Sequence, residues 1–178
     1  MRLMIEKKIT PSDVGNSQLS ALYRTAFPVD EQIPWQELMP LIDRMPLDFT
    51  AYMEGDALVG FTIVYPRSDF NWFWYFAVAE DLRGMGYGQK ILTRLMGRYK
   101  GKTMVLDMES PLQICANSEQ RRRRHQFYIR NGFRDTRLVR KYADIEMTIM
   151  ISGPGEFTAV DWDDITDDLK RFWWPDVD

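Results

Sequence analysis

The stretch that most constrains the fold is residues 71–88, which read NWFWYFAVAEDLRGMGYG. Its first part, residues 71–79, is almost wholly aromatic or apolar, as is typical of a strand covered on both faces. Glycines follow at positions 84, 86 and 88, and residues 88–99 then place apolar side chains on one helical face. The stretch therefore predicts a central strand, a glycine-rich turn and an amphipathic helix.

The glycine-rich turn has the composition of an anion site. With few side chains in the way, backbone N–H groups and the positive end of the following helix can surround a pyrophosphate, and Arg83 adds charge. A P-loop is excluded because Gln89 and Lys90 follow Gly88, and a dinucleotide fingerprint would need a third glycine at position 89. The alternative is a plain strand-to-helix turn whose glycines serve packing.

The rest of the chain alternates helical and strand patterns. The expected elements are a strand at 3–9, a helix from 11 to 26, one or two short helices interrupted by Pro34 and Pro40 within 30–45, a hairpin at 49–65, a strand at 103–108, a helix at 118–130, and strands at 133–139 and 144–151. This order indicates an α+β (α/β) domain, residues 1–153, built around a mixed sheet. Residues 154–178 form a tail with an amphipathic helix, expected to pack on the domain or on a partner.

Composition excludes several classes of protein. The chain has 178 residues, 45% of them hydrophobic and 28% charged, which is globular composition. A net charge of −3 disfavours binding to nucleic acid or to an anionic membrane. Cys115 is the one cysteine and His125 the one histidine, so neither a disulfide nor a Cys/His zinc site is expected, and no metal is needed. With no signal peptide and no long apolar run, a cytoplasmic location is expected.

Two motifs carry a family resemblance. Residues 83–88, RGMGYG, resemble the Arg/Gln-x-x-Gly-x-Gly/Ala coenzyme A signature of the GNAT superfamily of N-acetyltransferases. Residues 127–133, FYIRNGF, resemble the downstream tyrosine and Gly-Phe motif of that family. The resemblance spans about residues 3–151. It implies a GNAT-like, mostly antiparallel sheet flanked by helices, with two splayed parallel strands at 71–79 and 103–108 that hold acetyl-CoA.

The resemblance also implies site residues. Tyr128 matches the general acid that protonates the departing thiolate, and the backbone near Val78 matches the group that holds the thioester and stabilises the oxyanion. The family often has an asparagine where this chain has Arg121, so Asn117, four residues earlier, is the candidate for that contact with the coenzyme. The expected coenzyme-binding set is Phe76, Ala77, Val78, Arg83, Gly84, Met85, Gly86, Tyr87, Gly88, Asn117 and Tyr128.

An amine acceptor needs a base, because an amine with a pKa near 10 is mostly ammonium at pH 7. One candidate base is Glu109, which follows the strand at 103–108, where a carboxylate would face the reaction centre. The alternative is that Glu109 is an exposed acid at a strand end. The other candidate base is Glu31, which begins the segment interrupted by proline that is expected to line the acceptor cleft. The alternative is that Glu31 is an acid at a helix N-terminus, where the helix dipole favours it. The sequence leaves both open. The arginines at 121–124 point around the helix, which favours a solvated face or attraction of coenzyme phosphates.

The resulting hypothesis is an acetyl-CoA-dependent N-acetyltransferase. It would transfer acetyl directly to a primary amine of a small molecule, peptide or protein through a ternary complex. The alternative is a non-catalytic module that binds or senses acyl-CoA. A homodimer is common among the proteins that this chain resembles, and neither nucleic acid nor membrane is an expected partner.

Overall fold

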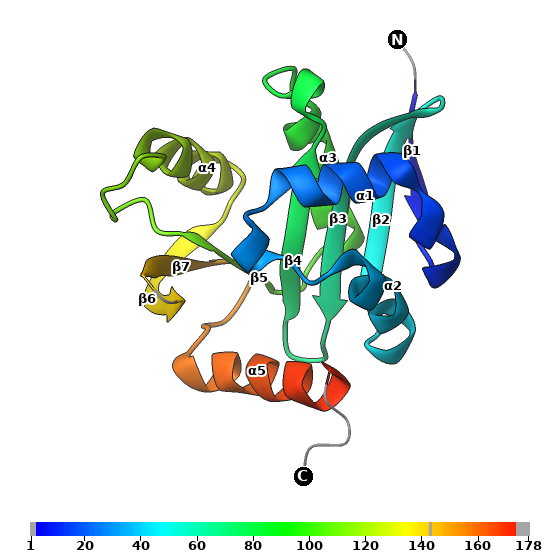
Figure 1. Cartoon of the computed structure of the whole chain (residues 1–178). Coiled ribbons are helices and arrows are strands. Elements are labelled where there is room, and N and C mark those ends of the chain that lie inside the picture. Colours follow the sequence, from blue (N-terminus) through cyan, green and yellow to red (C-terminus); the bar gives the residue numbers. More distant parts are fainter. Residues whose placement is uncertain (1–2, 143, 174–178) are drawn as a thin grey trace. The chain divides into compact units, whose positions relative to one another are not determined.

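A computed structural model describes residues 3–142 and 144–173, together with the side chains of all of these except Tyr142 and Trp173 (Figure 1). The hydrogen-bonded strands follow the order β1-β2-β3-β4-β5-β7-β6. The pair β4-β5 is parallel, and the sheet is otherwise mostly antiparallel, which confirms the predicted fold class. The strands are β1 (Met4–Lys8), β2 (Asp48–Glu54), β3 (Ala57–Pro66), β4 (Asn71–Val78), β5 (Met104–Glu109), β6 (Arg134–Tyr142) and β7 (Ile145–Ser152).

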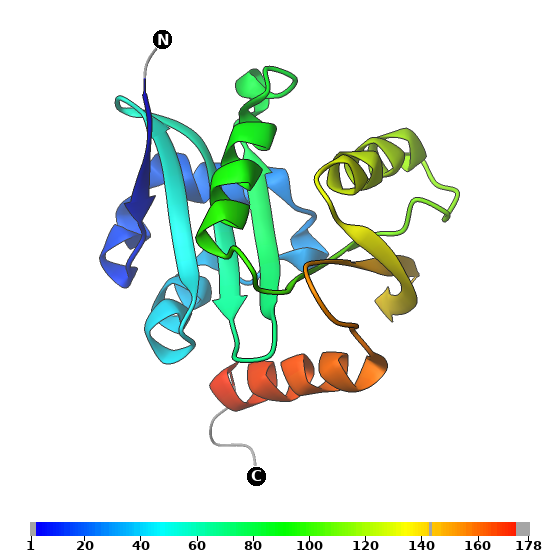
Figure 2. The same ribbon diagram turned by 180° about the vertical axis from the view of Figure 1, so that it is seen from behind.

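The chain divides into two compact units. Residues up to 66 together with 73–98 form the first unit, and residues 67–72 together with those from 99 onward form the second. In the first unit α1 (Ser17–Ala26) and α2 (Trp35–Arg44) lie on one face of the strands, whereas α3 (Tyr87–Arg98) lies on the other (Figures 1 and 2). The second unit contains α4 (Ser118–Arg130) and α5 (Ala159–Trp173).

Proline shapes the first unit differently from the sequence-based expectation. The chain makes a short 3-10 turn, η2 (Val29–Glu31), and then the single helix α2, which begins after Pro34 and runs through Pro40. A proline inside a helix removes one backbone hydrogen bond. Burial of the apolar face offsets that loss, since Leu38 and Leu41 are each almost completely buried. Packing therefore maintains a helix that local propensity would interrupt.

An aromatic core fills the space between the strands of the first unit and its helices α1 and α2. The Tyr23 ring lies 5.4 Å from that of Tyr75, and the Tyr23 hydroxyl is hydrogen bonded to both the carbonyl oxygen and the N–H of Ile33, at 2.9 Å each. The Tyr75 hydroxyl donates to the carbonyl oxygen of Glu31 at 2.6 Å. Two buried tyrosines thus satisfy backbone groups of the irregular segment that precedes α2.

The C-terminal helix α5 is packed within the second unit. Its Trp162 is 5% exposed, and the ring meets that of Trp72 edge-on at 5.8 Å. The Arg140 guanidinium lies 3.5 Å above the Trp162 ring, and Asp168 forms an ion pair with Arg67. The predicted amphipathic helix therefore buries its apolar face on its own chain. Residues 174–178 of the predicted tail lie outside the described residues.

Candidate functional site

The glycine-rich turn has the predicted strand–turn–helix geometry. β4 ends at Val78, a 3-10 turn η3 (Glu80–Leu82) follows, and α3 begins at Tyr87. Gly84 and Gly86 have φ angles of +77° and +83°, and nothing lies within 4 Å of a Cβ placed on either. These angles lie in the left-handed region, which only glycine adopts at little cost. The turn therefore depends on these two glycines for its backbone path and remains open on their outer side.

The turn presents the positive end of a helix. The N–H of Lys90 donates to the Gly86 carbonyl at 3.1 Å, which is the first α-helical hydrogen bond. N–H groups before that bond have no acceptor within the helix, and the helix dipole adds positive character there. The described first turn of α3 has no acidic residue, and Arg83 is exposed just before it. This arrangement suits an anionic ligand such as a pyrophosphate.

Side chains around the turn are held by the first unit itself. The Arg83 Nε donates to the Val78 carbonyl at 3.2 Å, so the guanidinium lies beside the end of β4. The Tyr87 hydroxyl donates to Glu54 at 2.9 Å, and this hydrogen bond raises the pKa of Tyr87. The Tyr87 hydroxyl is therefore engaged within the first unit, while the backbone of Tyr87 lies at the start of the helix.

A close approach of two strands positions the start of the turn. The pairing of β2 with β3 shifts register after Tyr52, and the Val59 carbonyl there accepts the Ala79 N–H at 2.9 Å. A Cβ on Gly60 would lie 2.4 Å from the Ala77 carbonyl oxygen. Sequence reasoning missed this glycine, although a glycine inside a strand is itself a signal for close backbone approach.

The middle of β4 is irregular. The rings of Trp74 and Tyr75 stack with centroids 5.2 Å apart and planes 22° apart. Those of Phe73 and Phe76 lie 5.6 Å apart. Successive residues of a regular strand point to opposite faces, so neither pair could meet on one. The side chains of residues 73–76 therefore depart from regular alternation, just before the residues predicted to hold a thioester.

Tyr128 lies in the second unit, on α4. Its side chain is buried, with 7% of the residue exposed, and its ring meets that of Phe133 at 5.4 Å. Burial raises the pKa of Tyr128 to about 12, and the positive charge of Arg124 opposes this shift. The phenol is therefore protonated throughout the neutral range, as a proton donor must be.

Glu109 is an ion-pair partner, so of the two interpretations left open for it, candidate base or exposed strand-end acid, the exposed acid is wrong. One carboxylate oxygen lies 3.0 Å from the Arg121 guanidinium, and the other accepts from Asn117 at 3.3 Å. The side chains of Arg121 and Glu109 are only 7% and 12% exposed. The expectation that Arg121 belongs to a solvated face is likewise wrong, because a buried guanidinium needs an anionic partner and Glu109 provides it. Asn117 extends this network at the start of α4.

Glu31, the other candidate base, is in the first unit. It ends the 3-10 turn η2 and so precedes α2 instead of beginning it. Its side chain is half-buried, and its carbonyl oxygen is held by Tyr75. The structure thus places one candidate base in each unit.

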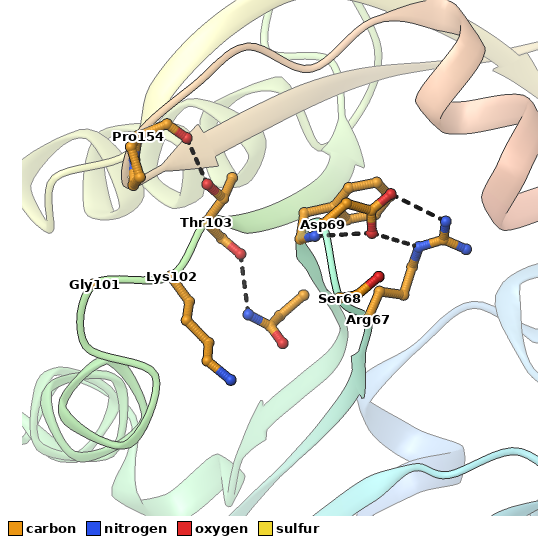
Figure 3. Close-up of a pocket in the computed structure, with 9 residues that line it drawn as sticks. Arg67, Ser68, Asp69, Gly101, Lys102, Thr103 and Pro154 are labelled. Carbon is orange, nitrogen blue, oxygen red and sulfur yellow. Dashed lines mark hydrogen bonds and ion pairs between the residues drawn. The ribbon is translucent and has the colours of Figure 1, made fainter.

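A cavity of about 200 Å³ lies in the second unit and is lined by residues other than the site candidates described above (Figure 3). It is bounded by the β3–β4 turn, where Arg67 contacts Asp69, and by the turn that carries Lys102 (Figure 3). Asn71, at the beginning of β4, also lines it and donates to the Thr103 carbonyl at 3.1 Å. The glycine-rich turn follows the opposite end of β4, and none of the predicted site residues lines this cavity.

Comparison with known proteins identifies the family. Residues 48–135 match the model of the acetyltransferase (GNAT) domain, a range that includes the glycine-rich turn and Tyr128. The search of curated proteins found no match. Among the described helices none is long and apolar enough to cross a membrane.

Solved structures show the same fold. A protein of Bacteroides thetaiotaomicron assigned to the GNAT family of acetyltransferases has 25% identity and a TM-score of 0.74, with 94% of this chain and 96% of that chain covered. The ribosomal-protein-S18-alanine N-acetyltransferase of Escherichia coli has 16% identity and a TM-score of 0.64, covering 88% and 99%. PaiA N-acetyltransferase of Thermoplasma acidophilum, solved in complex with coenzyme A, has 15% identity and a TM-score of 0.58, covering 85% and 99%.

These findings confirm the resemblance that the two sequence motifs indicated. Residues 48–135 of the chain match the GNAT acetyltransferase domain, and the fold is that of GNAT-family acetyltransferases. Acetyl transfer from a coenzyme A thioester is the reaction class that this family supports.

Proposed function

We propose that the protein is an acetyl-CoA-dependent N-acetyltransferase that passes acetyl directly to a primary amine in a ternary complex. The observation that carries the proposal is the glycine-rich turn, with Gly84 and Gly86 at positive φ, opening onto the N-terminus of α3. That geometry suits a coenzyme pyrophosphate. The acceptor is a small molecule or a peptide or protein amine.

The coenzyme would be held mainly by backbone groups. Within residues 83–88 the N–H groups of Arg83 and Met85 donate to the carbonyl oxygens of Glu80 and Leu82, so the pyrophosphate would take the N–H groups of Gly84 and of residues 86–88. The Arg83 guanidinium adds positive charge. Residues 76–78 lie along the thioester, whose carbonyl oxygen accepts the Val78 N–H. The Ala79 N–H is donated to Val59, which supports assigning the oxyanion contact to Val78.

Tyr128 supplies the proton to the departing thiolate in this proposal. Its raised pKa keeps it protonated until the thiolate forms. Asn117, the N-cap residue of α4, is the proposed side-chain contact to the coenzyme. For the base, Glu109 and Glu31 are the candidates that the sequence provides, and the ion pair with Arg121 weighs against Glu109 because it engages one carboxylate oxygen.

A non-catalytic acyl-CoA-binding module is the alternative, and one experiment separates the two. Calorimetry with acetyl-CoA, and with NADH as control, first measures coenzyme binding. Release of the coenzyme thiol is then followed with tyramine, spermidine and an Nα-blocked lysine peptide as acceptors. We expect micromolar binding of acetyl-CoA only, and turnover with at least one amine that falls at least 10-fold in Tyr128→Phe.

Each outcome of that experiment has a distinct meaning. Binding without turnover on any amine would favour the sensing module. Failure of a folded sample to bind acetyl-CoA would refute both functions. We also propose a homodimer, which light scattering after size exclusion tests by the measured mass.

A further inference from the structure

The cavity of about 200 Å³ in the second unit has walls that are joined by hydrogen bonds (Figure 3). The Asn71 N–H donates to the Thr103 carbonyl at 2.8 Å, and the Thr103 hydroxyl donates to the Pro154 carbonyl. The Arg134 guanidinium donates to the carbonyl of Gly153 at 2.8 Å, which holds the segment before Pro154. The cavity is therefore largely preformed, as small-molecule sites usually are. Its volume exceeds the roughly 150 Å³ of a cavity that binds benzene, so a ligand of about six non-hydrogen atoms fits.

One buried side chain of the lining has an acceptor atom that is not used. Asn71 is 1% exposed, and its Nδ2 donates to the Thr103 carbonyl at 3.1 Å. Its Oδ1 is buried and accepts no hydrogen bond from the described residues. A buried carbonyl oxygen that accepts no hydrogen bond is unfavourable, and such atoms are rare in folded proteins. A ligand in this cavity that carries an N–H or O–H group would supply the missing donor.

The charged side chains of the lining differ in how they are paired. Arg67 contacts Asp69 at 3.0 Å and also forms an ion pair with Asp168. The hydrogen bond from Arg67 lowers the pKa of Asp69, so this carboxylate is ionised at neutral pH. Lys102, which is exposed, forms no ion pair within the part of the chain that the structure describes. Figure 3 shows Lys102 on one side of the cavity and Arg67 with Asp69 on the other.

These groups together select a ligand with two poles. An anionic group can pair with the Lys102 ammonium, and a donor group can bond to the Asn71 Oδ1. The ionised carboxylate of Asp69 in the same lining repels a doubly charged anion such as phosphate and favours an ammonium as the donor. A small zwitterion meets all three conditions, and an α-amino acid of about six non-hydrogen atoms also matches the volume.

We propose that this cavity binds a free α-amino acid, whose carboxylate pairs with Lys102 and whose ammonium donates to the Oδ1 of Asn71. The site lies wholly within the second unit and uses none of the residues proposed for acetyl transfer. This inference therefore does not rest on the proposed function, and each can fail without the other.

The test is an NMR titration of the ¹⁵N-labelled full chain with L-alanine at pH 7, without acetyl-CoA. We expect a Kd of about 1 mM or below, with shifts at the backbone amides of residues 67–71 and 101–103. The side-chain amide signals of Asn71 should also move, because the ligand bonds to the oxygen of that amide. Acetate lacks the donor and ethylamine lacks the carboxylate, so each should bind at least about 10-fold more weakly.

Two variants and a matched control assign the contacts. Lys102→Gln removes the unpaired charge from an exposed position and should weaken L-alanine binding at least about 10-fold. Lys100→Gln removes a charge from an exposed residue of the same turn that does not line the cavity, so its Kd should stay within about twofold of the wild type. Asn71→Leu removes the acceptor and should weaken binding by a similar factor to Lys102→Gln.

The outcomes separate an amino-acid site from the alternatives. If L-alanine moves none of these signals, the cavity holds only water and the proposal is overturned. Acetate or inorganic phosphate that binds as tightly as L-alanine would make this a simple anion site, which also overturns it. Wild-type affinity in Lys102→Gln contradicts the carboxylate contact. If Asn71→Leu does not fold, the Lys102→Gln and Lys100→Gln pair and the Asn71 side-chain signals of the wild type still decide the question.

Discussion

Gly60→Ala should displace the end of β4, which leads into the glycine-rich turn, because the backbones of β3 and β4 approach closely at Gly60. A Cβ at this position would lie 2.4 Å from the Ala77 carbonyl oxygen and 2.9 Å from Ile91 Cδ1. Real Cβ contacts essentially never fall below 3.0 Å, so backbone atoms must move by at least about 0.6 Å. Because Ala77 and Val78 end β4, that movement displaces the strand from which the turn begins.

Overpacking of this kind costs about 1–3 kcal/mol. For a chain of this length the corresponding fall in Tm is about 2–4 °C for each kcal/mol. Acetyl-CoA affinity should fall as well, since Phe76, Ala77 and Val78 are the residues proposed to lie along the thioester. Urea unfolding monitored by tryptophan fluorescence gives the free energy of unfolding, and calorimetry gives the Kd.

Gly97→Ala is the matched control. Gly97 is exposed on α3, and nothing lies within 4 Å of a Cβ placed there. Alanine is the better helix former, so this variant should gain about 0.4–1 kcal/mol with no change in Kd. If Gly60→Ala were as stable as the wild type and bound acetyl-CoA equally well, the close contact between β3 and β4 would not exist as described.

Three further predictions concern the ion pair, the acid and the turn. Arg121→Leu leaves the carboxylate of Glu109 buried and unpaired, so the free energy of unfolding should fall by about 3–5 kcal/mol in urea; a loss below 1 kcal/mol would mean that solvent screens the pair. The folded pKa of Tyr128, about 12, lies above the ordinary value of 10.0, so its contribution to stability is complete below pH 10 and is lost as the pH rises to 12. Tyr128→Phe should flatten that part of the stability profile, and an unchanged slope in melts at pH 9–12 would contradict the buried phenol. Gly84→Ala forces alanine to a φ of +77° in open space, so it should cost about 1–2 kcal/mol and raise the KM for acetyl-CoA, whereas an unchanged Tm would show that the turn relaxes freely.

Local patterns in the sequence were enough to predict most of the elements. The aromatic run before the glycines indicated β4, the apolar spacing after them indicated α3, and the predicted helix at 118–130 agrees with α4. These features depend on residues close together in the chain, because helical periodicity, strand composition and the φ freedom of glycine are local properties. The same locality let two short motifs indicate the family before any tertiary contact was known.

The features that depend on residues far apart in the chain needed the structure. Arg121 and Glu109 are separated by a loop, and only folding of α4 beside β5 turns a residue expected in solvent into a buried ion-pair partner. The need for glycine at position 60 comes from Ala77 on another strand. Periodicity says which face of a strand a residue occupies, whereas burial, charge pairing and proton affinity depend on what packs against that face. For this reason the sequence by itself determined most of the elements, the turn and the family resemblance, while the tertiary structure decided which acids are buried and engaged by a cation.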